Sequence, residues 1–247
     1  MEKWEDRTVR LIGKENFEKI KEKVVLIFGV GGVGGIALEA LVRSGISNVG
    51  IVNMDKISVS NINRQIIANT KTVGKYKTDV FKERLKDINP DLNIYALNEK
   101  ITIENLEEII ENVKKHFGKI DYIIDAIDDV PVKIENIIYC AKKDINLIVS
   151  MGAGFKMDTS KVRVSNIFKT NSCKLAKKIR KSINDFLKNE NILNKENFKK
   201  ITAVYSEEET MKPTEFDGKN DIASMMFVPA SFGLKIAELV IKDIIEI

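Results

Sequence analysis

Strand-like and helix-like segments alternate along the first 150 residues, and this alternation constrains the fold more than any other feature of the sequence. Residues 24–28 are continuously apolar, which is typical of a strand buried on both faces. The expected strands are 24–28, 49–54, 93–97, 122–126 and 146–150, and the expected helices are 33–43, 78–88, 104–115 and 132–142. This order predicts an α/β fold with a doubly wound, mostly parallel, Rossmann-like sheet that binds ligands at the carboxyl ends of its strands.

The pattern changes after about residue 155. A strand-like run, a lysine-rich helical pattern, a charged stretch without periodicity and a charge-interrupted apolar segment follow at 162–168, 173–188, 207–221 and 224–247. We expect the last segment to be an amphipathic helix packed on the core, with no stable membrane insertion and with peripheral membrane contact as the weaker alternative. The predicted organisation is a domain of residues 1–155, which begins with a helical arm, and a C-terminal α+β extension of residues 156–247 that completes the same globule.

The composition narrows the class of protein. With 247 residues, 44% of them hydrophobic, the chain is long enough to bury a full core. A net charge of +4 neither requires nor excludes a nucleic-acid partner. The two cysteines, Cys140 and Cys173, belong to no CxxC pair, and the N-terminus is too polar for a signal peptide. We therefore expect a reducing, cytoplasmic location and no structural zinc, with Cys140 in the core.

The turn after the first predicted strand indicates a nucleotide site. Residues 29–35 read Gly-Val-Gly-Gly-Val-Gly-Gly, between a strand and a helix. Glycines let the backbone approach a phosphate, and the helix N-terminus supplies free amide groups. Such a turn fits NAD as well as ATP, and Asp55, at the end of the second strand, is expected to hold a ribose in either case.

The polar cluster after Asp55 favours ATP. Residues 61–65 read Asn-Ile-Asn-Arg-Gln, and residues 74–77, Gly-Lys-Tyr-Lys, open the next helix. A triphosphate requires fixed cations and amide donors beside the glycine turn, whereas a dehydrogenase has little use for them. Each residue alone has an ordinary explanation as a turn cap or a solvated side chain. The whole string in this order is not explained in that way.

Together these motifs resemble the adenylation domain of the ubiquitin-activating superfamily, which includes the activating enzymes of the molybdopterin and thiamin pathways. The resemblance rests on Gly-x-Gly-Gly-Val-Gly at 29–34, the Asp-to-Gln string at 55–65, Val-Gly-x-x-Lys at 73–77 and Asp-Ala-Ile-Asp at 125–128. It implies ATP and Mg²⁺ as cofactors. Arg7 resembles an arginine that reaches the γ-phosphate, in the superfamily usually from the partner subunit, so the resemblance also implies a homodimer.

The residues that match the family's motifs are expected to contact the nucleotide through backbone, acidic, amide and basic groups. The implied nucleotide contacts are Gly29, Gly31, Gly32, Asp55, Asn61, Asn63, Arg64, Gln65, Lys77 and Asp128. Asp128 would hold magnesium or face the reacting α-phosphate. Arg7, Arg64, Lys77 and Asp128 are the expected catalytic residues, because adenylation of a carboxylate mainly requires orientation and charge neutralisation.

The second half of the chain resembles one branch of this superfamily, the tRNA threonylcarbamoyladenosine dehydratases. The segments that carry this resemblance are 150–158, 164–167, 169–170, 205–208 and 227–233. It implies that ATP activates the threonyl carboxylate of N6-threonylcarbamoyladenosine in tRNA and that ring closure expels AMP without an enzyme thioester. The sequence departs from the family pattern at Gly35, Thr159, Cys173, Lys174 and Ala203. None of these touches the phosphate contacts, but Ala203 stands where some members have Cys, which puts a sulfur relay there in doubt.

A basic helix face accompanies this resemblance. Four lysines spaced i, i+3, i+4 and i+7 share one side of the helix predicted at 173–188: Lys174, Lys177, Lys178 and Lys181. A solvated face is the ordinary explanation for such a stripe. With the family resemblance, we expect it to contact the tRNA backbone. Lys133 and Lys156 are candidates for recognising the modified base, and His116 is expected to be structural.

Three other interpretations fit parts of the sequence. The first is activation of a ubiquitin-like or sulfur-carrier C-terminus, although that branch usually has zinc-binding CxxC pairs. There Cys173, at a helix start beside Lys174, would be the nucleophile to consider. A sulfur-transfer protein is a candidate partner for either activity. The second is a nucleotide-binding module without turnover, which would be free to lose Arg64, Lys77 and Asp128. The third is an NAD dehydrogenase. A failure to bind NAD would exclude this interpretation.

Overall fold

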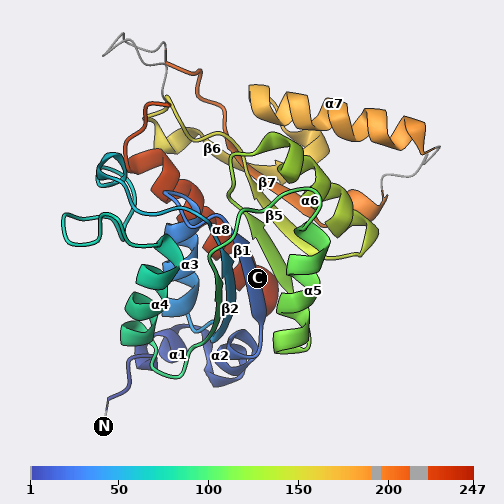
Figure 1. Cartoon of the computed structure of the whole chain (residues 1–247). Helices are drawn as coiled ribbons and strands as arrows, with labels where there is room; N and C mark the ends of the chain where they lie inside the picture. Colours follow the sequence, from blue (N-terminus) through green and yellow to red (C-terminus); the bar gives the residue numbers. More distant parts are fainter. Residues whose placement is uncertain (1, 191–195, 212–221) are drawn as a thin grey trace.

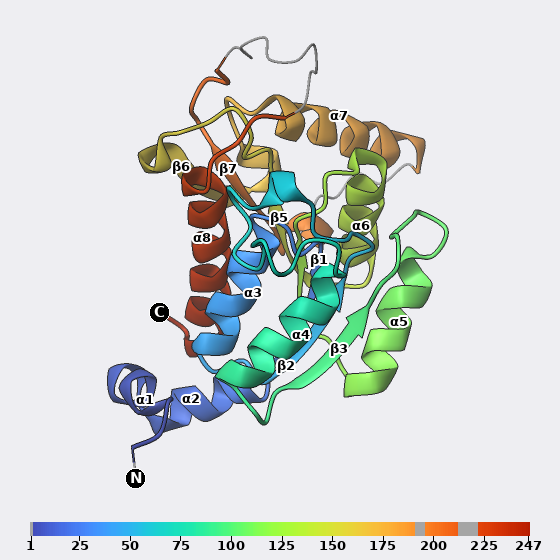
Figure 2. The ribbon, with the colours of Figure 1, turned by 60° about the vertical axis from the view of Figure 1, so that its left-hand side comes forward.

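The computed structural model describes residues 2–190, 196–211 and 222–247. These residues form a seven-stranded sheet with helices on both faces (Figures 1 and 2). The strand order is β3-β2-β1-β4-β5-β7-β6, and all neighbours are parallel except β6 and β7. The predicted doubly wound, mostly parallel sheet is therefore confirmed.

The elements have the following bounds. The strands are β1 (Val24–Phe28), β2 (Asn48–Val52), β3 (Asn93–Leu97), β4 (Tyr122–Asp125), β5 (Asn146–Ser150), β6 (Val162–Asn166) and β7 (Ile201–Ser206). The helices are α1 (Asp6–Ile12), α2 (Lys14–Lys21), α3 (Gly34–Arg43), α4 (Lys77–Ile88), α5 (Leu106–Phe117), α6 (Val130–Lys142), α7 (Lys174–Asn189) and α8 (Phe227–Ile245). No helix of the described ranges is both long and apolar enough to cross a membrane.

The sheet separates two apolar layers, and β1 contributes to both. Its side chains alternate: Val25 and Ile27 belong to the core shared with α3, α4 and α8, and Leu26 and Phe28 to the core shared with α5, α6 and α7. All four side chains are fully buried. A strand that is covered on both faces has no solvent side, which explains the continuous apolar run in the sequence.

The C-terminal third of the chain extends the same sheet. β7 pairs in parallel with β5, β6 closes the edge antiparallel to β7, and α8 packs against α3. A Cβ atom on Gly233 would lie 2.5 Å from the carbonyl oxygen of Val33, so α8 needs glycine at this point of closest approach.

In this region one predicted strand is shorter than expected, and one strand was not predicted. The strand expected at 162–168 ends at Asn166, whose side chain accepts a hydrogen bond from the Phe168 amide (3.1 Å) and opens a 3₁₀ turn. β7 was not predicted as a strand, although its residues, Ile-Thr-Ala-Val-Tyr-Ser, are of the β-branched and aromatic types that favour one. Residues 212–221 of the predicted charged stretch lie outside the described residues.

Candidate nucleotide site

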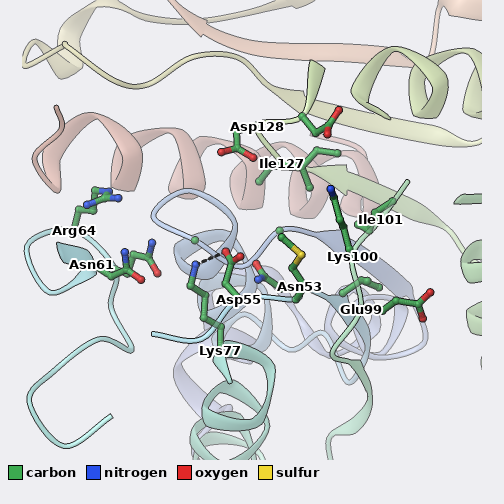
Figure 3. A pocket seen from close by; sticks show the side chains of 17 residues that line it. Asn53, Asp55, Asn61, Arg64, Lys77, Glu99, Lys100, Ile101, Ile127 and Asp128 are labelled. Carbon is green, nitrogen blue, oxygen red and sulfur yellow. Dashed lines mark hydrogen bonds and ion pairs between the residues drawn. The ribbon is translucent and has the colours of Figure 1, made fainter. Parts of the chain in front are cut away.

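A cavity of about 530 Å³ opens at the carboxyl ends of β1, β2, β3 and β4 (Figure 3). In open α/β sheets this edge is where ligands bind, because the loops after neighbouring parallel strands converge there. Of the predicted nucleotide contacts, the cavity is lined by Gly29, Gly31, Asp55, Asn61, Arg64, Gln65, Lys77 and Asp128. Gly32, Asn63 and Arg7 are not among its lining residues.

The turn between β1 and α3 is packed so closely that it requires glycine. Gly29 has φ +83°, and a Cβ atom there would lie 2.8 Å from the carbonyl oxygen of Ala126. A Cβ atom on Gly34 would lie 1.9 Å from the carbonyl oxygen of Gly29. The amide of Val30 donates to Oδ1 of the buried Asn53 (3.0 Å), which ties the turn to the end of β2. The backbone of the turn is thereby held against both neighbouring strands.

Asp55 and Lys77 form an ion pair on the floor of the cavity. Lys77 Nζ lies 2.7 Å from Asp55 Oδ2; the lysine side chain is 7% exposed and that of the aspartate 47%. Burial raises the pKa of Asp55, but the hydrogen bond and charge of Lys77, with a hydrogen bond from Asn53, lower it below its ordinary value. Asp55 is therefore ionised at neutral pH, with part of its carboxylate accessible to a ligand.

The segment after β2 carries Arg64 to the rim of the cavity. Arg64 Nη1 donates to the carbonyl oxygen of Ser60 (2.7 Å) and to Asn63 Oδ1 (3.0 Å). Asn63 Nδ2 in turn donates to the carbonyl oxygen of Ser224 (2.8 Å), just before α8. Asn63 thus orients the arginine instead of lining the cavity. The guanidinium keeps further donors for a ligand.

Two amide side chains complete this segment. Oδ1 of Asn61 accepts a hydrogen bond from the Ser58 amide (3.2 Å) and so stabilises a turn. Turn capping was the ordinary role that the sequence suggested for such a residue. Gln65 is 7% exposed, and its Oε1 has no hydrogen-bond partner among the described residues. A buried amide oxygen without a donor is costly, so a ligand or water that supplied one would be favoured at this place.

Asp128 stands across the cavity from the Asp55–Lys77 pair (Figure 3). Its side chain is exposed and makes no hydrogen bond to any part of the chain that the structure describes. Nor do the described residues contain a group of three or more His, Cys, Asp or Glu that could hold a metal ion. A single free carboxylate fits Mg²⁺, which takes most of its ligands from water and substrate phosphates.

Several lining residues were not predicted. They follow the ends of β2, β3 and β4: Asn53, Met54, Glu99, Lys100, Ile101, Ile127 and Asp129. Their position just after predicted strands was the signal that could have found them, since such positions converge at one edge. Met54, Ile101 and Ile127 add apolar surface on which an aromatic base can pack.

Other candidate residues lie away from the cavity. Arg7 is exposed on α1, at the opposite, amino-terminal edge of the sheet (Figure 1). Lys133 is fully buried in an ion pair with Asp125, and Lys156 is buried and donates to the carbonyl oxygen of Glu208. The expectation that these two lysines face the modified base is therefore wrong. Lysines are seldom fully buried unless they are paired, and the sequence alone does not reveal these partners.

The remaining predictions concern α7, the cysteines and the histidine. The four lysines of the predicted stripe, Lys174, Lys177, Lys178 and Lys181, are all exposed on α7. Cys140 is fully buried in the core as expected, whereas Cys173 is half-buried at the N-cap of α7. His116 is exposed, and its ring lies 5.2 Å from that of Tyr95.

Known proteins resemble the chain over nearly its whole length. The ThiF family model matches residues 5–246. The tRNA threonylcarbamoyladenosine dehydratases of Bacillus subtilis and Haemophilus influenzae are 36% and 32% identical, over 95% and 96% of this chain and 92% and 91% of theirs. The crystal structure of Escherichia coli tRNA N6-threonylcarbamoyladenosine dehydratase, TcdA, in complex with AMP superposes with a TM-score of 0.85 at 29% identity, covering 97% of this chain and 93% of that one. The chain therefore belongs to the ThiF family, among the tRNA threonylcarbamoyladenosine dehydratases.

Proposed function

We propose that this protein is an ATP-dependent dehydratase that adenylates the threonyl carboxylate of N6-threonylcarbamoyladenosine in tRNA and then closes the ring with release of AMP. A carboxylate oxygen attacks the α-phosphorus and pyrophosphate leaves. A nucleophile of the carbamoyl group then attacks the activated acyl carbon, and AMP departs with the carboxylate oxygen. The observation that carries the proposal is the cavity, where a glycine turn meets Arg64, Lys77 and the carboxylate of Asp128, in a chain of which 95% aligns with such a dehydratase.

In this proposal the cavity acts mainly by position and charge. Arg64 and Lys77 neutralise the phosphates, and Asp55 accepts a hydrogen bond from a ribose hydroxyl. Lys77 already pairs with Asp55, so it would connect the ribose and phosphate subsites. Asp128 would hold Mg²⁺ or face the α-phosphate; the ion, when bound, would neutralise charge that develops on the phosphate oxygens. The dehydration itself forms no enzyme thioester, so a sulfur-transfer partner protein would act outside this step.

Two surfaces complete the proposal. In a homodimer, Arg7 reaches the γ-phosphate of the ATP bound in the cavity of the second copy. It cannot serve its own cavity, because it lies at the opposite edge of the sheet. The α7 stripe of Lys174, Lys177, Lys178 and Lys181 contacts the tRNA backbone, since exposed cations on one helix face suit a line of phosphates. Acting on tRNA, the enzyme would work in the cytoplasm.

The proposal is tested by the conversion of tRNA that carries N6-threonylcarbamoyladenosine, with ATP and Mg²⁺. Nucleoside digests are analysed by mass spectrometry for the loss of one water. We expect wild type to convert the nucleoside only with ATP, and Arg64→Ala to lower kcat/KM by about 100-fold or more, because a charged phosphate contact is lost. Lys71→Ala, an exposed lysine outside the cavity lining, is the control.

The outcome that would contradict the proposal is equally specific. If the wild-type protein binds ATP but leaves the modified tRNA unchanged, the assignment as a dehydratase is wrong. Pyrophosphate exchange driven by a carrier protein that ends in Gly-Gly would then identify the alternative, activation of a ubiquitin-like or sulfur-carrier C-terminus.

A further inference from the structure

A polar cluster lies buried directly behind the cavity, at the junction of β4 and α6. Asp125, Lys133 and Asn136 are all fully buried. Lys133 Nζ pairs with Asp125 Oδ1 and also approaches the Asp125 carbonyl oxygen (3.4 Å), and Asn136 Nδ2 donates to Asp125 Oδ2 (2.9 Å). The thiol of Cys140 donates to Asn136 Oδ1 (3.4 Å). None of these four residues lines the cavity.

The cluster is attached to the turn that carries Asp128. Asp125 is the last residue of β4, and its Oδ1 also accepts from the Ile127 amide (3.3 Å). At the other end of the turn, Asp129 caps α6 by accepting from the Val132 amide (3.1 Å). The glycine turn presses on its inner side, since a Cβ on Gly29 would lie 2.8 Å from the Ala126 carbonyl oxygen. Residues 126–128 are therefore held at both ends and on one side.

Stability alone does not account for this cluster. Phe28 and Val149, the register partners of Asp125 in the neighbouring strands, are both apolar and belong to the buried core. The desolvation cost of a fully buried ion pair can exceed its Coulombic gain, so an apolar core of the same volume is often at least as stable. What such a pair adds is a fixed geometry, because a carboxylate with all its donors in place permits few arrangements of the backbone that bears it.

We propose that the Asp125–Lys133–Asn136 cluster is a positioning device for the adenylation step, which fixes the 126–128 turn so that the Asp128 carboxylate stands across the cavity from Lys77. The inference rests on the proposed function for its reaction, and on the geometry of the turn for its mechanism. Asp128 would be the group that meets the reacting phosphate or its Mg²⁺, and the three cluster residues would act only through it.

The test compares Asp125→Asn/Lys133→Met, which removes both buried charges together, with wild type. The matched control is Glu39→Gln/Arg84→Met, which removes the ion pair between α3 and α4, away from the cavity. AMP formation with modified tRNA gives kcat and the KM for ATP, and calorimetry gives ATP affinity with and without Mg²⁺. Both variants are repeated with Asp128→Asn added, which makes a double-mutant cycle.

We expect the cluster variant to lower kcat about 10- to 100-fold, as small displacements of reacting groups do. ATP affinity without Mg²⁺ should stay within about twofold of wild type, and the cluster substitutions should cause no further loss in the Asp128→Asn background. The control should lose stability but keep kcat. An unchanged kcat in the cluster variant, or an undiminished loss in the Asp128→Asn background, would overturn the inference.

If the double variant does not fold, Asn136→Ser takes its place, because this substitution leaves the ion pair intact and removes one hydrogen-bond donor from Asp125. It should lower kcat about threefold or more at unchanged ATP affinity, and an unchanged kcat would overturn the inference. If wild type itself forms no AMP with modified tRNA, the proposed function fails. The positioning inference is then decided by calorimetry: the gain in ATP affinity from Mg²⁺ must fall in the cluster variant as it does in Asp128→Asn.

Discussion

Glu39 shows how single buried charges are stabilised in this protein. Its carboxylate accepts from Arg84 Nε (2.6 Å) and from Arg43 Nε (2.9 Å), and so links α3 to α4. Burial raises the pKa of Glu39, but the hydrogen bonds and the charges of Arg84 and Arg43 outweigh it and lower the pKa below its ordinary value. The carboxylate is therefore ionised at neutral pH although its side chain is only 7% exposed.

The stability contributed by Glu39 is expected to depend on pH. Because its folded-state pKa lies below its unfolded value, the contribution is present above about pH 4.5 and is lost as the pH falls through the folded pKa. Glu39→Gln should lower the free energy of unfolding by about 1–3 kcal/mol at pH 7, and the difference from wild type should shrink in acid. Urea unfolding at pH 7 and below pH 4.5 measures it; a difference that is independent of pH would contradict the assignment.

At the scale of elements, α8 links the C-terminal part of the chain to the nucleotide site. It packs along α3 through Gly233, and Pro229 lies beside the glycine turn, 3.4 Å from where a Cβ on Gly32 would stand. The segment just before α8 also accepts the hydrogen bond of Asn63. The cavity rim at Asn63 and Arg64 is therefore stabilised by a segment about 160 positions away in the sequence.

The close approach of α8 to α3 predicts the effect of a single methyl group. Gly233→Ala should lower the free energy of unfolding by about 1–3 kcal/mol, since its Cβ would meet backbone atoms that cannot rotate away. Leu234→Ala, one residue further and 57% exposed, is the control and should change it by less than about 0.5 kcal/mol. Urea denaturation compares the two, and equal effects would contradict this packing argument.

The α7 stripe predicts a separate effect on tRNA binding. Changing Lys174, Lys177, Lys178 and Lys181 to Gln should raise the KM for tRNA about 10-fold or more at low salt and reduce its salt dependence, while the KM for ATP stays unchanged. The control carries the same change of charge at four exposed lysines of α4 and α5: Lys82, Lys86, Lys114 and Lys115. If both variants raise the KM for tRNA equally, α7 is not the tRNA surface.

At the scale of the whole molecule, the role proposed for Arg7 depends on where this residue lies. α1 and α2 precede β1 and lie at the amino-terminal edge of the sheet, while the cavity opens at the carboxyl edge (Figures 1 and 3). A single chain therefore does not bring Arg7 to its own cavity. A contribution from Arg7 requires a second copy of the chain.

This arrangement predicts complementation between two impaired variants. Arg7→Ala and Arg64→Ala should each lose most of the activity alone, but a mixed dimer would contain one site with both arginines. Random reassociation of equal amounts should restore about a quarter of wild-type activity, since half of the dimers are mixed and each has one intact site of two. Mixed dimers without activity, or a fully active monomer, would contradict the shared site.

Local sequence patterns were sufficient to predict the sheet and the polar groups at its edge. The apolar run of β1 and the glycine turn depend on short-range patterns, and a residue between a strand and a helix can be read from its neighbours. Asp55, Arg64, Lys77 and Asp128 were placed at one edge for the same reason, since the carboxyl ends of parallel strands converge.

Which charges are buried, and which segments meet, depends on how the folded chain packs. Lys133 was a candidate for recognising the modified base, and nothing near it in the helix pattern reveals that it pairs with the buried Asp125. The role of Asn63 in orienting Arg64 depends likewise on Ser224, which comes from the other end of the chain. Local periodicity carries no information about such long-range contacts, which form only when the chain packs.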